Sequence, residues 1–369
     1  MVGYIYFGYP LLVFILARLI NRKVKKGCYS PSITIIIAAY NEERYIEETI
    51  RNKLALDYPG DKCEIIVVSD ASDDRTDDLV RKYEHLGVRL IRQEPRSGKT
   101  SALNRAVLEA KGEIIVFSDA NSIYESDALK KLIQNFNDPE VGYVTGKMVY
   151  ANPDGSLVGD GCSTYMNYEN LLRRQETKIG SIVGVDGGID AVRKGLYRAM
   201  NPDQLPDFIL PLGVVEQGYR VVYEPQAVLQ ESTLNASGDE YRMRVRVSLR
   251  CLWALWDIRQ LLNVMRFGVF AWQLWSHKVL RYLCFLFLIA AYGCNLMLWK
   301  EGGPYPVLFT LQNAVYLGAV VSHVLERRAL HLRFFYLAHY FVLLNLASAH
   351  AFVKFVLGQK QVMWTPRKG

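Results

Sequence analysis

Three aspartates stand at positions where a carboxylate could act on a bound ligand. Asp70 and Asp119 each end a short run of mostly β-branched residues, and Asp207 lies between apolar neighbours. The carboxylate of Asp70 could accept a hydrogen bond from the imide N–H of a uracil. Asp119 and Asn121 are two residues apart, so on an extended chain their oxygens face one side and could hold Mg²⁺ or Mn²⁺ against a diphosphate. The apolar setting of Asp207 favours a raised pKa, which suits a general base.

Each of these residues also has a structural explanation. Asp70 precedes a segment rich in Ser and Asp, which is typical of a helix N-cap. Asn121 is a common residue type in turns after strands. Asp207 could cap a helix, in which case Glu231 or Asp186 becomes the candidate base.

Cationic side chains provide candidate contacts to phosphate. Lys99 lies in a segment that resembles the end of a P-loop, but the glycine that this motif requires is Gln93 here, which excludes an ATPase of that kind. Lys99 near a helix start remains a candidate phosphate contact, with a solvated lysine as the alternative. Arg242, Arg246 and Arg250 fall four apart on a helix expected at 241–263. That ridge could lie on an anionic bilayer or reach a diphosphate.

The elements that must position these residues follow from the pattern of the chain. Short β-branched runs alternate with helical stretches, which predicts an α/β domain with a parallel sheet. Such a sheet binds its ligand beyond the carboxyl ends of its strands, so the polar residues there converge on one cleft. We expect strands at 33–38, 64–68, 88–91 and 113–117 and helices at 42–56, 76–85 and 101–110.

Together these motifs resemble the inverting family 2 glycosyltransferases with the GT-A fold, a Rossmann-like domain, including enzymes similar to bacterial exopolysaccharide, cellulose and hyaluronan synthases. The resemblance covers residues 32–232. It is carried by Ala39-Tyr40-Asn41-Glu42, Ser69-Asp70-Ala71-Ser72, Gly98-Lys99, Ser118-Asp119-Ala120-Asn121, the loop 184–188 and Asp207-Phe208.

The resemblance implies a nucleotide-diphosphate-sugar donor, most simply a UDP-sugar, and a saccharide or lipid-linked acceptor. Tyr40 would pack on the base, Glu42 lie near the ribose, Asp70 bind the uracil and Lys99 lie near the phosphates. The implied nucleotide site is Ala39, Tyr40, Glu42, Asp70, Lys99, Asp119 and Ala120.

The same resemblance assigns the remaining roles. Asp119 corresponds to the first position of the DxD metal motif, whose third position is Asn121, so the site has one anionic ligand fewer. Asp207 corresponds to the catalytic base, although Pro206 replaces the preceding acid. Gly184, Asp186 and Gly187 would meet the donor sugar and acceptor. A QxxRW motif is missing, and Arg242, Arg244 or Arg246 stands where its diphosphate-binding arginine is expected.

Apolar segments at both ends predict an integral membrane protein. The run at 4–20 is followed by Arg22, Lys23, Lys25 and Lys26, which places the next block in the cytosol, with the bacterial inner membrane as the expected location. A cleaved signal peptide is the alternative. Further apolar segments occupy 279–299, 306–325 and 334–357.

We therefore divide the chain into four parts. Residues 1–26 form a transmembrane helix with a basic flank, and 27–238 a cytosolic GT-A domain. Residues 239–277 form amphipathic interfacial helices, and 278–369 hold two or three transmembrane helices and a tail.

Composition excludes some other classes. The six cysteines have no CxxC spacing, which argues against a thiolate metal site, and the net charge of +7 comes without a nucleic-acid motif. The expected partners are the donor, the acceptor, the bilayer and other components of a polysaccharide synthesis or export system. A processive synthase, a membrane-bound nucleotidyltransferase and an inactive scaffold are the alternatives.

Overall fold

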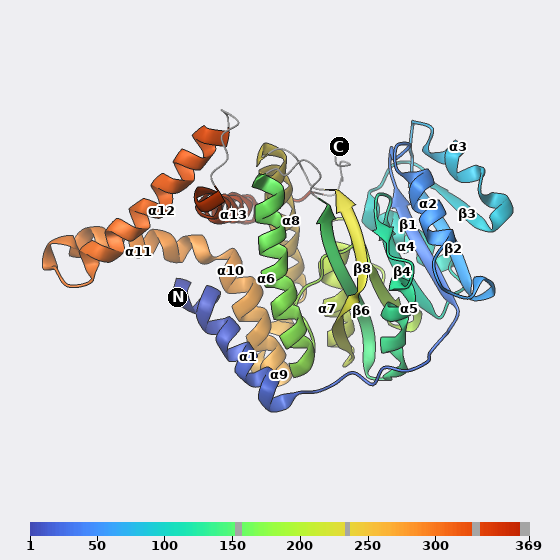
Figure 1. Cartoon of the computed structure of the whole chain (residues 1–369), viewed down its shortest axis with the longest axis horizontal. Coiled ribbons are helices and arrows are strands. Elements are labelled where there is room, and N and C mark those ends of the chain that lie inside the picture. Colours follow the sequence, from blue (N-terminus) through green and yellow to red (C-terminus); the bar gives the residue numbers. More distant parts are fainter. Residues whose placement is uncertain (152–156, 233–236, 327–332, 362–369) are drawn as a thin grey trace.

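An eight-stranded sheet forms one end of the molecule and a group of helices the other (Figure 1). The structure is a computed structural model that describes residues 1–151, 157–232, 237–326 and 333–361. The order across the sheet is β3-β2-β1-β4-β7-β6-β8-β5. The strands are β1 (Ile33–Ala39), β2 (Cys63–Asp70), β3 (Val88–Gln93), β4 (Ile114–Asp119), β5 (Ile123–Tyr124), β6 (Val141–Ala151), β7 (Asp190–Arg193) and β8 (Arg220–Ser232).

Half of the sheet is the parallel unit that the sequence predicts. β1 pairs in parallel with β2 and β4, and β2 with β3. The crossover helices are α2 (Ile46–Leu54), α3 (Thr76–Arg81) and α4 (Lys99–Glu109). β1 is buried along its whole length because helices cover both faces: Ile35 packs toward α2 and α5 (Ala128–Ile133), and Ile36 toward α4 and α7 (Pro206–Glu216).

The other half is mixed and was not predicted. β7 runs antiparallel to β4 and β6, whereas β8 is parallel to β6 and antiparallel to β5. Asp190, the first residue of β7, pairs with Phe117 near the end of β4. Because the two strands run in opposite directions, the loop 184–188 that precedes β7 lies at the carboxyl end of β4.

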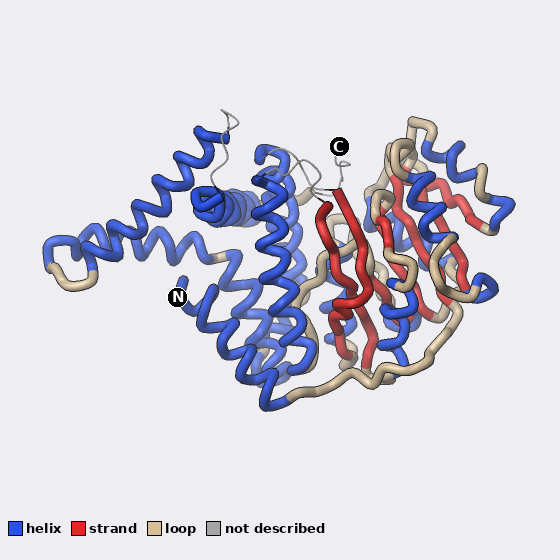
Figure 2. The backbone as a smooth tube through the Cα atoms, in the orientation of Figure 1, coloured by secondary structure: helices blue, strands red, loops and turns tan. Residues whose placement is uncertain are grey.

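A helical layer packs beside the sheet, as the tube in Figure 2 shows. It contains α1 (Tyr9–Ile20), α6 (Leu157–Ile179), α8 (Ser237–Asp257), α9 (Val264–Leu274) and α10 (Leu280–Tyr282). On α1, Tyr9, Val13 and Ala17 form one buried face that packs against Leu172 and Ile179 of α6. The predicted end of the single helix expected at 241–263 is wrong. α8 ends at Asp257, and a 3-10 turn, Arg259–Leu262, follows.

Three long apolar helices follow, in agreement with the three apolar segments of the sequence: α11 (Cys284–Leu298), α12 (Tyr305–Glu326) and α13 (Arg333–Val356). In the described residues the stretches long and apolar enough to cross a membrane are Cys284–Glu301, Tyr305–Leu325 and Leu337–Val356, and the apolar helix Tyr4–Ile20 is shorter. α11 and α12 project away from the rest of the molecule (Figure 1), whereas α13 packs on α8.

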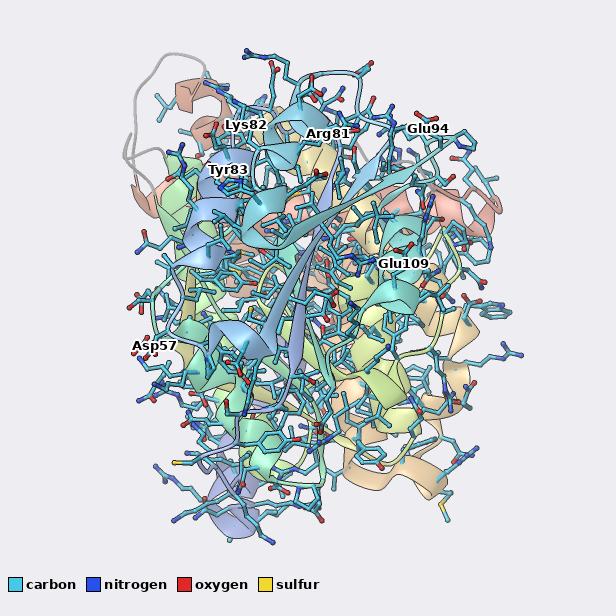
Figure 3. The ribbon with its side chains drawn as sticks, turned by 90° about the vertical axis from the view of Figure 1, so that its right-hand side faces the viewer. Asp57, Arg81, Lys82, Tyr83, Glu94 and Glu109 are labelled. Carbon is cyan, nitrogen blue, oxygen red and sulfur yellow. The ribbon has the colours of Figure 1, made fainter. Side chains whose placement is uncertain are left out.

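The opposite end of the molecule is polar. Figure 3 looks onto the side of the sheet that β3 borders. Exposed charged residues there include Asp57, Arg81, Lys82, Glu94 and Glu109. The charged end and the apolar α11–α12 pair therefore lie at opposite ends of the long axis.

Candidate active site

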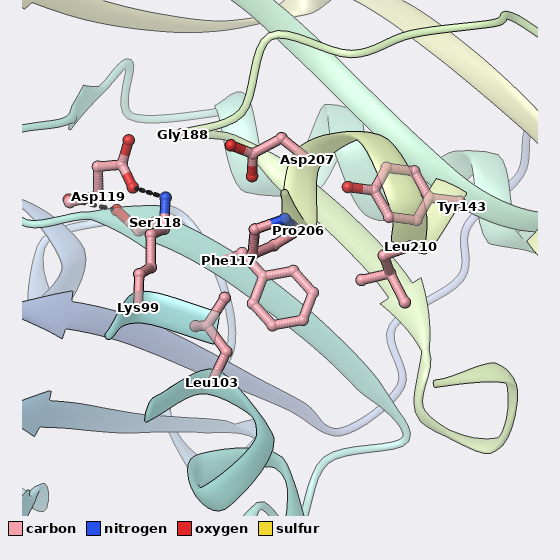
Figure 4. Close-up of a pocket in the computed structure, with 10 residues that line it drawn as sticks. All are labelled: Lys99, Leu103, Phe117, Ser118, Asp119, Tyr143, Gly188, Pro206, Asp207 and Leu210. Atoms are coloured by element: carbon pink, nitrogen blue, oxygen red, sulfur yellow. Dashed lines mark hydrogen bonds and ion pairs between the residues drawn. The ribbon is translucent and has the colours of Figure 1, made fainter. Parts of the chain in front are cut away.

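A pocket lies at the carboxyl end of β4, where the sequence predicts a ligand cleft (Figure 4). Lys99, Asp119 and Asp207, three of the predicted site residues, all line it. The complete lining is Lys99, Leu103, Phe117, Ser118, Asp119, Tyr143, Gly188, Pro206, Asp207 and Leu210. Residues of α4, β4, β6 and α7 thus line one pocket, in which Lys99, Asp119 and Asp207 lie among apolar neighbours.

Lys99 and Asp119 form an ion pair inside this pocket. Nζ of Lys99, the first residue of α4, lies 2.5 Å from Oδ1 of Asp119, the last residue of β4. The preceding Gly98 has a φ of 92°, which favours glycine and turns the chain into α4. Burial alone would lower the pKa of Lys99, but the carboxylates of Asp119 and Asp207 raise it above its ordinary value. The ammonium therefore stays charged.

Asp207 projects from the first turn of α7, directly after Pro206 at the helix start. Burial raises the pKa of Asp207; the charge of Lys99 opposes this effect and that of Asp119 adds to it. Within the described residues no hydrogen bond to the Asp207 carboxylate is present, and the α7 N-cap has no side-chain cap bond. The geometry thus leaves this carboxylate available to a ligand.

The glycine loop 184–188 packs directly on Asp207. Gly187 has a φ of 84°, and a Cβ on it would lie 2.9 Å from Cγ and Oδ2 of Asp207. Asp186 accepts a bidentate ion pair from the buried Arg173, whose Nε also donates to the carbonyl oxygen of Gly184 over 3.1 Å. Arg173 on α6 therefore fixes the loop, and Asp186 is committed to that ion pair.

The predicted base-binding residues lie farther along the sheet edge. The guanidinium carbon of Arg96 lies 3.5 Å from the centroid of the Tyr40 ring. Asp70 is buried and accepts hydrogen bonds from Gln93 Nε2 at 2.6 Å, the amide of Ser97 at 2.8 Å and that of Gly98 at 2.9 Å. In this structure Asp70 thus holds the loop that leads to Lys99, and its contact with a uracil stays a prediction.

Asn121 lies in a turn, so the argument from an extended chain is wrong for this residue. β4 ends at Asp119, and the turn is closed by the amide of Ser122 bonding to the carbonyl of Asp119 over 3.3 Å. The side chain of Asn121 donates from Nδ2 to Oε1 of the buried Glu231 over 3.3 Å. With Nδ2 directed at Glu231, the amide oxygen is left for another partner.

Two further predicted residues of the nucleotide site flank these turns. Ala39 ends β1 and is fully buried, and the main-chain amide of Glu42 donates to Oγ1 of Thr76 over 2.8 Å. Ala120 is buried, and its carbonyl accepts from Oγ1 of Thr49 over 2.6 Å. The backbone at the predicted nucleotide site is therefore fixed by hydrogen bonds from neighbouring helices.

Two arginines of α8, Arg244 and Arg250, make different contacts. Arg244 donates to Glu240 at 2.7 Å and to the Tyr340 hydroxyl at 2.8 Å, which joins α8 to α13. Arg250 is buried, and it donates to Thr100 Oγ1 at 3.1 Å and to the carbonyl of Gln204. The roles of Arg242, Arg244 and Arg246 at the diphosphate stay predictions, whereas Arg250 contacts the segments that carry Lys99 and Asp207.

Some residues near the pocket had no sequence signal. Asp190 on β7 is buried, and neither carboxylate oxygen has a hydrogen-bond partner in the described part of the chain. Burial and the charge of Asp207 raise the pKa of Asp190 far above its ordinary value. Asp190 and Arg173 lie in a strand and a helix, where the sequence does not separate them from ordinary polar positions.

The side chains at the end of β4 suit a divalent cation in their chemistry. Asp119, Asn121 and Glu231 offer the carboxylate and amide oxygens that hard cations prefer. Asp119 already binds a cation, the Lys99 ammonium. No cluster of three or more His, Cys, Asp or Glu side chains with the spacing of a complete metal site occurs in the residues that the structure describes.

The fold is that of the GT-A glycosyltransferases. Residues 34–197 match the family model for glycosyl transferase family 2, and the chain therefore contains a family 2 glycosyltransferase domain. The predicted family and fold class are confirmed.

Relatives with this domain make polysaccharides. The poly-β-1,6-N-acetyl-D-glucosamine synthase of Staphylococcus aureus (strain COL) is 29% identical over 265 residues, which are 68% of this chain and 64% of that protein. The synthase of the same name from Staphylococcus epidermidis is 26% identical over 272 residues, 70% of this chain and 66% of that protein. This chain thus spans a little under two thirds of the length of these relatives.

A solved structure has the same fold across almost the entire chain. It is a mannosyltransferase from Pyrobaculum calidifontis in complex with GDP-Man and Mn²⁺, with a TM-score of 0.74 and 24% identity, and the superposition covers 97% of both chains. At this identity the similarity establishes the fold.

Proposed function

We propose that this chain is an inverting glycosyltransferase that moves a sugar from a UDP-sugar to a hydroxyl of a saccharide or lipid-linked acceptor. The transfer takes place at the cytosolic face of the membrane, in the synthesis of a cell-surface polysaccharide. The observation that carries the proposal is the meeting of Lys99, Asp119 and Asp207 in one pocket of a GT-A fold.

In the proposed reaction the acceptor hydroxyl is deprotonated on one face of the donor sugar, and the diphosphate departs from the other. Asp207, whose pKa burial raises, accepts the proton of the acceptor hydroxyl. The acceptor oxygen then bonds to the anomeric carbon while the bond from that carbon to the diphosphate breaks, and UDP departs from the opposite face. One displacement of this kind inverts the anomeric configuration.

The leaving diphosphate requires compensation for its charge. Lys99 is positioned to donate to a phosphate oxygen when it leaves Asp119. Asp119 and the amide oxygen of Asn121 would hold Mg²⁺ or Mn²⁺, which supplies electrostatic stabilisation of the departing diphosphate when bound. The mannosyltransferase of the same fold was solved with Mn²⁺, which supports this proposal.

For the donor base we propose uracil, held by stacking on Tyr40. The sugar is a hexose or an N-acetylhexosamine, and the names of the staphylococcal relatives favour N-acetylglucosamine. The mannosyltransferase binds GDP-Man, so a guanine donor is the specific competitor.

For the membrane we propose that the apolar helices anchor the catalytic domain at the bacterial inner membrane. The basic residues after α1 favour a cytosolic domain. The polymer-synthase relatives make processive synthesis with translocation the second candidate function.

The test is transfer by the purified full chain in nanodiscs, supplied with Mn²⁺ and one radiolabelled donor at a time: UDP-GlcNAc, UDP-Glc, UDP-Gal or GDP-Man. We expect UDP release and a product of inverted configuration by NMR. Preference for GDP-Man would refute the base assignment, and a retained configuration would refute the mechanism. If long polymers form when the enzyme is limiting, the result favours processive synthesis over single transfer.

A further inference from the structure

Lys278 brings a cation to the glycine loop from the membrane side of the molecule. It lies in the π-helical turn Trp275–Val279, between α9 and α10. A Cβ on Gly184 would lie 2.5 Å from Nζ of Lys278 and 2.6 Å from its Cε. The missing side chain at position 184 therefore makes the room in which this ammonium group sits.

The carboxylates near Lys278 are already bonded to other groups. Glu169 lies 3.1 Å from Nε2 of His277 and pairs with Arg281. Glu176 lies 2.7 Å from Nδ1 of His277 and accepts a hydrogen bond from the Tyr9 hydroxyl over 2.5 Å. These bonds hold the turn that presents Lys278.

The carboxylate of the loop is committed as well, because Asp186 pairs with Arg173. Among the residues that the structure describes, no hydrogen bond or ion pair to Lys278 is present. A mostly buried ammonium group without a partner is costly unless a ligand satisfies it.

The electrostatic surroundings of Lys278 suit an anion. Burial lowers the pKa of Lys278, and Arg173 and Arg281 lower it further, against the opposing effect of Glu169. Arg173 and Arg281 are already paired with Asp186 and Glu169, so the charge that an anion would meet here is that of Lys278 itself.

The position of Lys278 indicates which substrate carries that anion. On one side the glycine loop leads through Gly187 to the base Asp207. On the other side the chain continues into the candidate membrane span Cys284–Glu301. The cation for the donor diphosphate, Lys99, projects from α4 on the sheet side of the pocket. A ligand that contacts Lys278 and Asp207 together therefore reaches from the membrane boundary to the reacting centre.

We propose that Lys278 binds a phosphate group of the acceptor, so that the acceptor is a saccharide carried on a phosphorylated lipid. This inference rests on the proposed function and selects one of its two acceptor classes. The sugar hydroxyl meets Asp207 while the phosphate stays at Lys278 and takes no part in bond making.

The experiment uses the full chain in phosphatidylcholine nanodiscs and compares Lys278→Met and Lys278→Arg with wild type. Lys300→Met is the control. Lys300 is an exposed lysine that follows α11, whereas Lys278 precedes this helix. The acceptors are a polyprenyl-diphosphate-linked N-acetylglucosamine and a neutral octyl N-acetylglucosaminide. We expect Lys278→Met to raise KM for the phosphorylated acceptor at least about tenfold, with kcat within about threefold, because a charge-assisted contact is lost.

The neutral acceptor, Lys278→Arg and Lys300→Met should show no such change, and UDP affinity by calorimetry should stay within about threefold of wild type. An equal rise in KM for both acceptors would show that Lys278 has a structural role. Weaker UDP binding would show that Lys278 contacts the donor. A defect seen only in nanodiscs with phosphatidylglycerol would assign the anion to bulk lipid. Any of these three results overturns the inference, whereas absence of all transfer by wild type refutes the proposed function itself.

Discussion

The ammonium nitrogen of Lys99 lies 2.5 Å from Oδ1 of Asp119. The carboxylate expected to hold a divalent cation therefore already holds a cation that belongs to the protein. A diphosphate that attracts Lys99 frees Asp119 and adds oxygen ligands of its own. Binding of metal and binding of nucleotide should consequently favour each other, by the same factor in both directions.

This coupling can be measured by removing the competing charge. We expect Mn²⁺ to bind weakly to the free protein and at least about tenfold more tightly with UDP present. Lys99→Met should tighten Mn²⁺ binding to the free protein and weaken UDP binding. Titration calorimetry reads both, with exposed Lys82→Met as the control. Equal Mn²⁺ affinity with and without UDP, or tight binding that Asp119→Ala leaves unchanged, would contradict the assignment.

Asp207→Asn keeps the size of the side chain and removes the proton acceptor. We expect transfer to fall by about a hundredfold to ten-thousandfold, with UDP affinity within about threefold. Burial raises the pKa of Asp207, and a base must be ionised, so wild-type activity should decline as the pH falls through that raised value. The decline should begin at a higher pH than an ordinary aspartate would give. If Asp207→Asn keeps more than about a tenth of the activity, Asp207 is structural and Glu231 becomes the next candidate.

Gly187→Ala tests the contact between the glycine loop and the base. Alanine is strained at a φ of 84°, and its Cβ would lie 2.9 Å from the Asp207 carboxylate, so the carboxylate must move. We expect kcat to fall at least about tenfold with little change in UDP affinity. The matched control is Gly195→Ala, because a Cβ there meets no atom within 4 Å. Similar effects of the two substitutions on kcat would show that the contact is unimportant.

Glu231→Gln tests whether a carboxylate that is 110 residues from Asn121 in the sequence supports the metal site. Glu231 orients Asn121 through a bond of 3.3 Å and places a negative charge beside it. We expect Mn²⁺ affinity in the presence of UDP to fall about three- to tenfold, while UDP affinity without metal is unchanged. Exposed Glu84→Gln is the control. Unchanged Mn²⁺ affinity would limit Glu231 to packing.

Cys28 reports the side of the membrane on which the catalytic domain lies. It is exposed, and it follows the basic segment after α1. With a cytosolic domain, an impermeant maleimide should label Cys28 only after the cells are opened. Labelling of Cys28 in intact cells would place the domain outside.

The sequence predicts the parallel half of the fold well because that half is specified locally. Each of β1, β2 and β4 is a β-branched run bounded by polar residues, and the ends of each strand lie within two residues of the predicted ends. The mixed half depends on pairing between segments far apart in the chain, such as Val141 with Arg220. No local pattern encodes that choice of partner.

The candidate site divides in the same way. Asp119 and Asp207 could be found because each follows an apolar run or interrupts apolar neighbours. The contacts of Arg250 could not be predicted, because its partners Gln204 and Thr100 are 46 and 150 residues away. A main-chain carbonyl and a threonine hydroxyl carry no sequence pattern that marks them as partners of an arginine. The same holds for Arg173, because its contacts are with Gly184 and Asp186 and depend on the folded position of the loop 184–188.

The packing of the N-terminal helix has a consequence for biosynthesis. Tyr4 bonds to Ser276 over 2.8 Å although the two are 272 residues apart, and Tyr9 reaches Glu176 from the same face of the helix. During translation the apolar surface of α1 stays uncovered until α6 and α9, which pack against it, have been synthesised. Contacts of such long sequence separation form late and slowly, and the exposed surface invites aggregation in the interval. Early capture of α1 by lipid or by the insertion machinery would protect the nascent chain until residues 264–282 emerge to complete the helical layer.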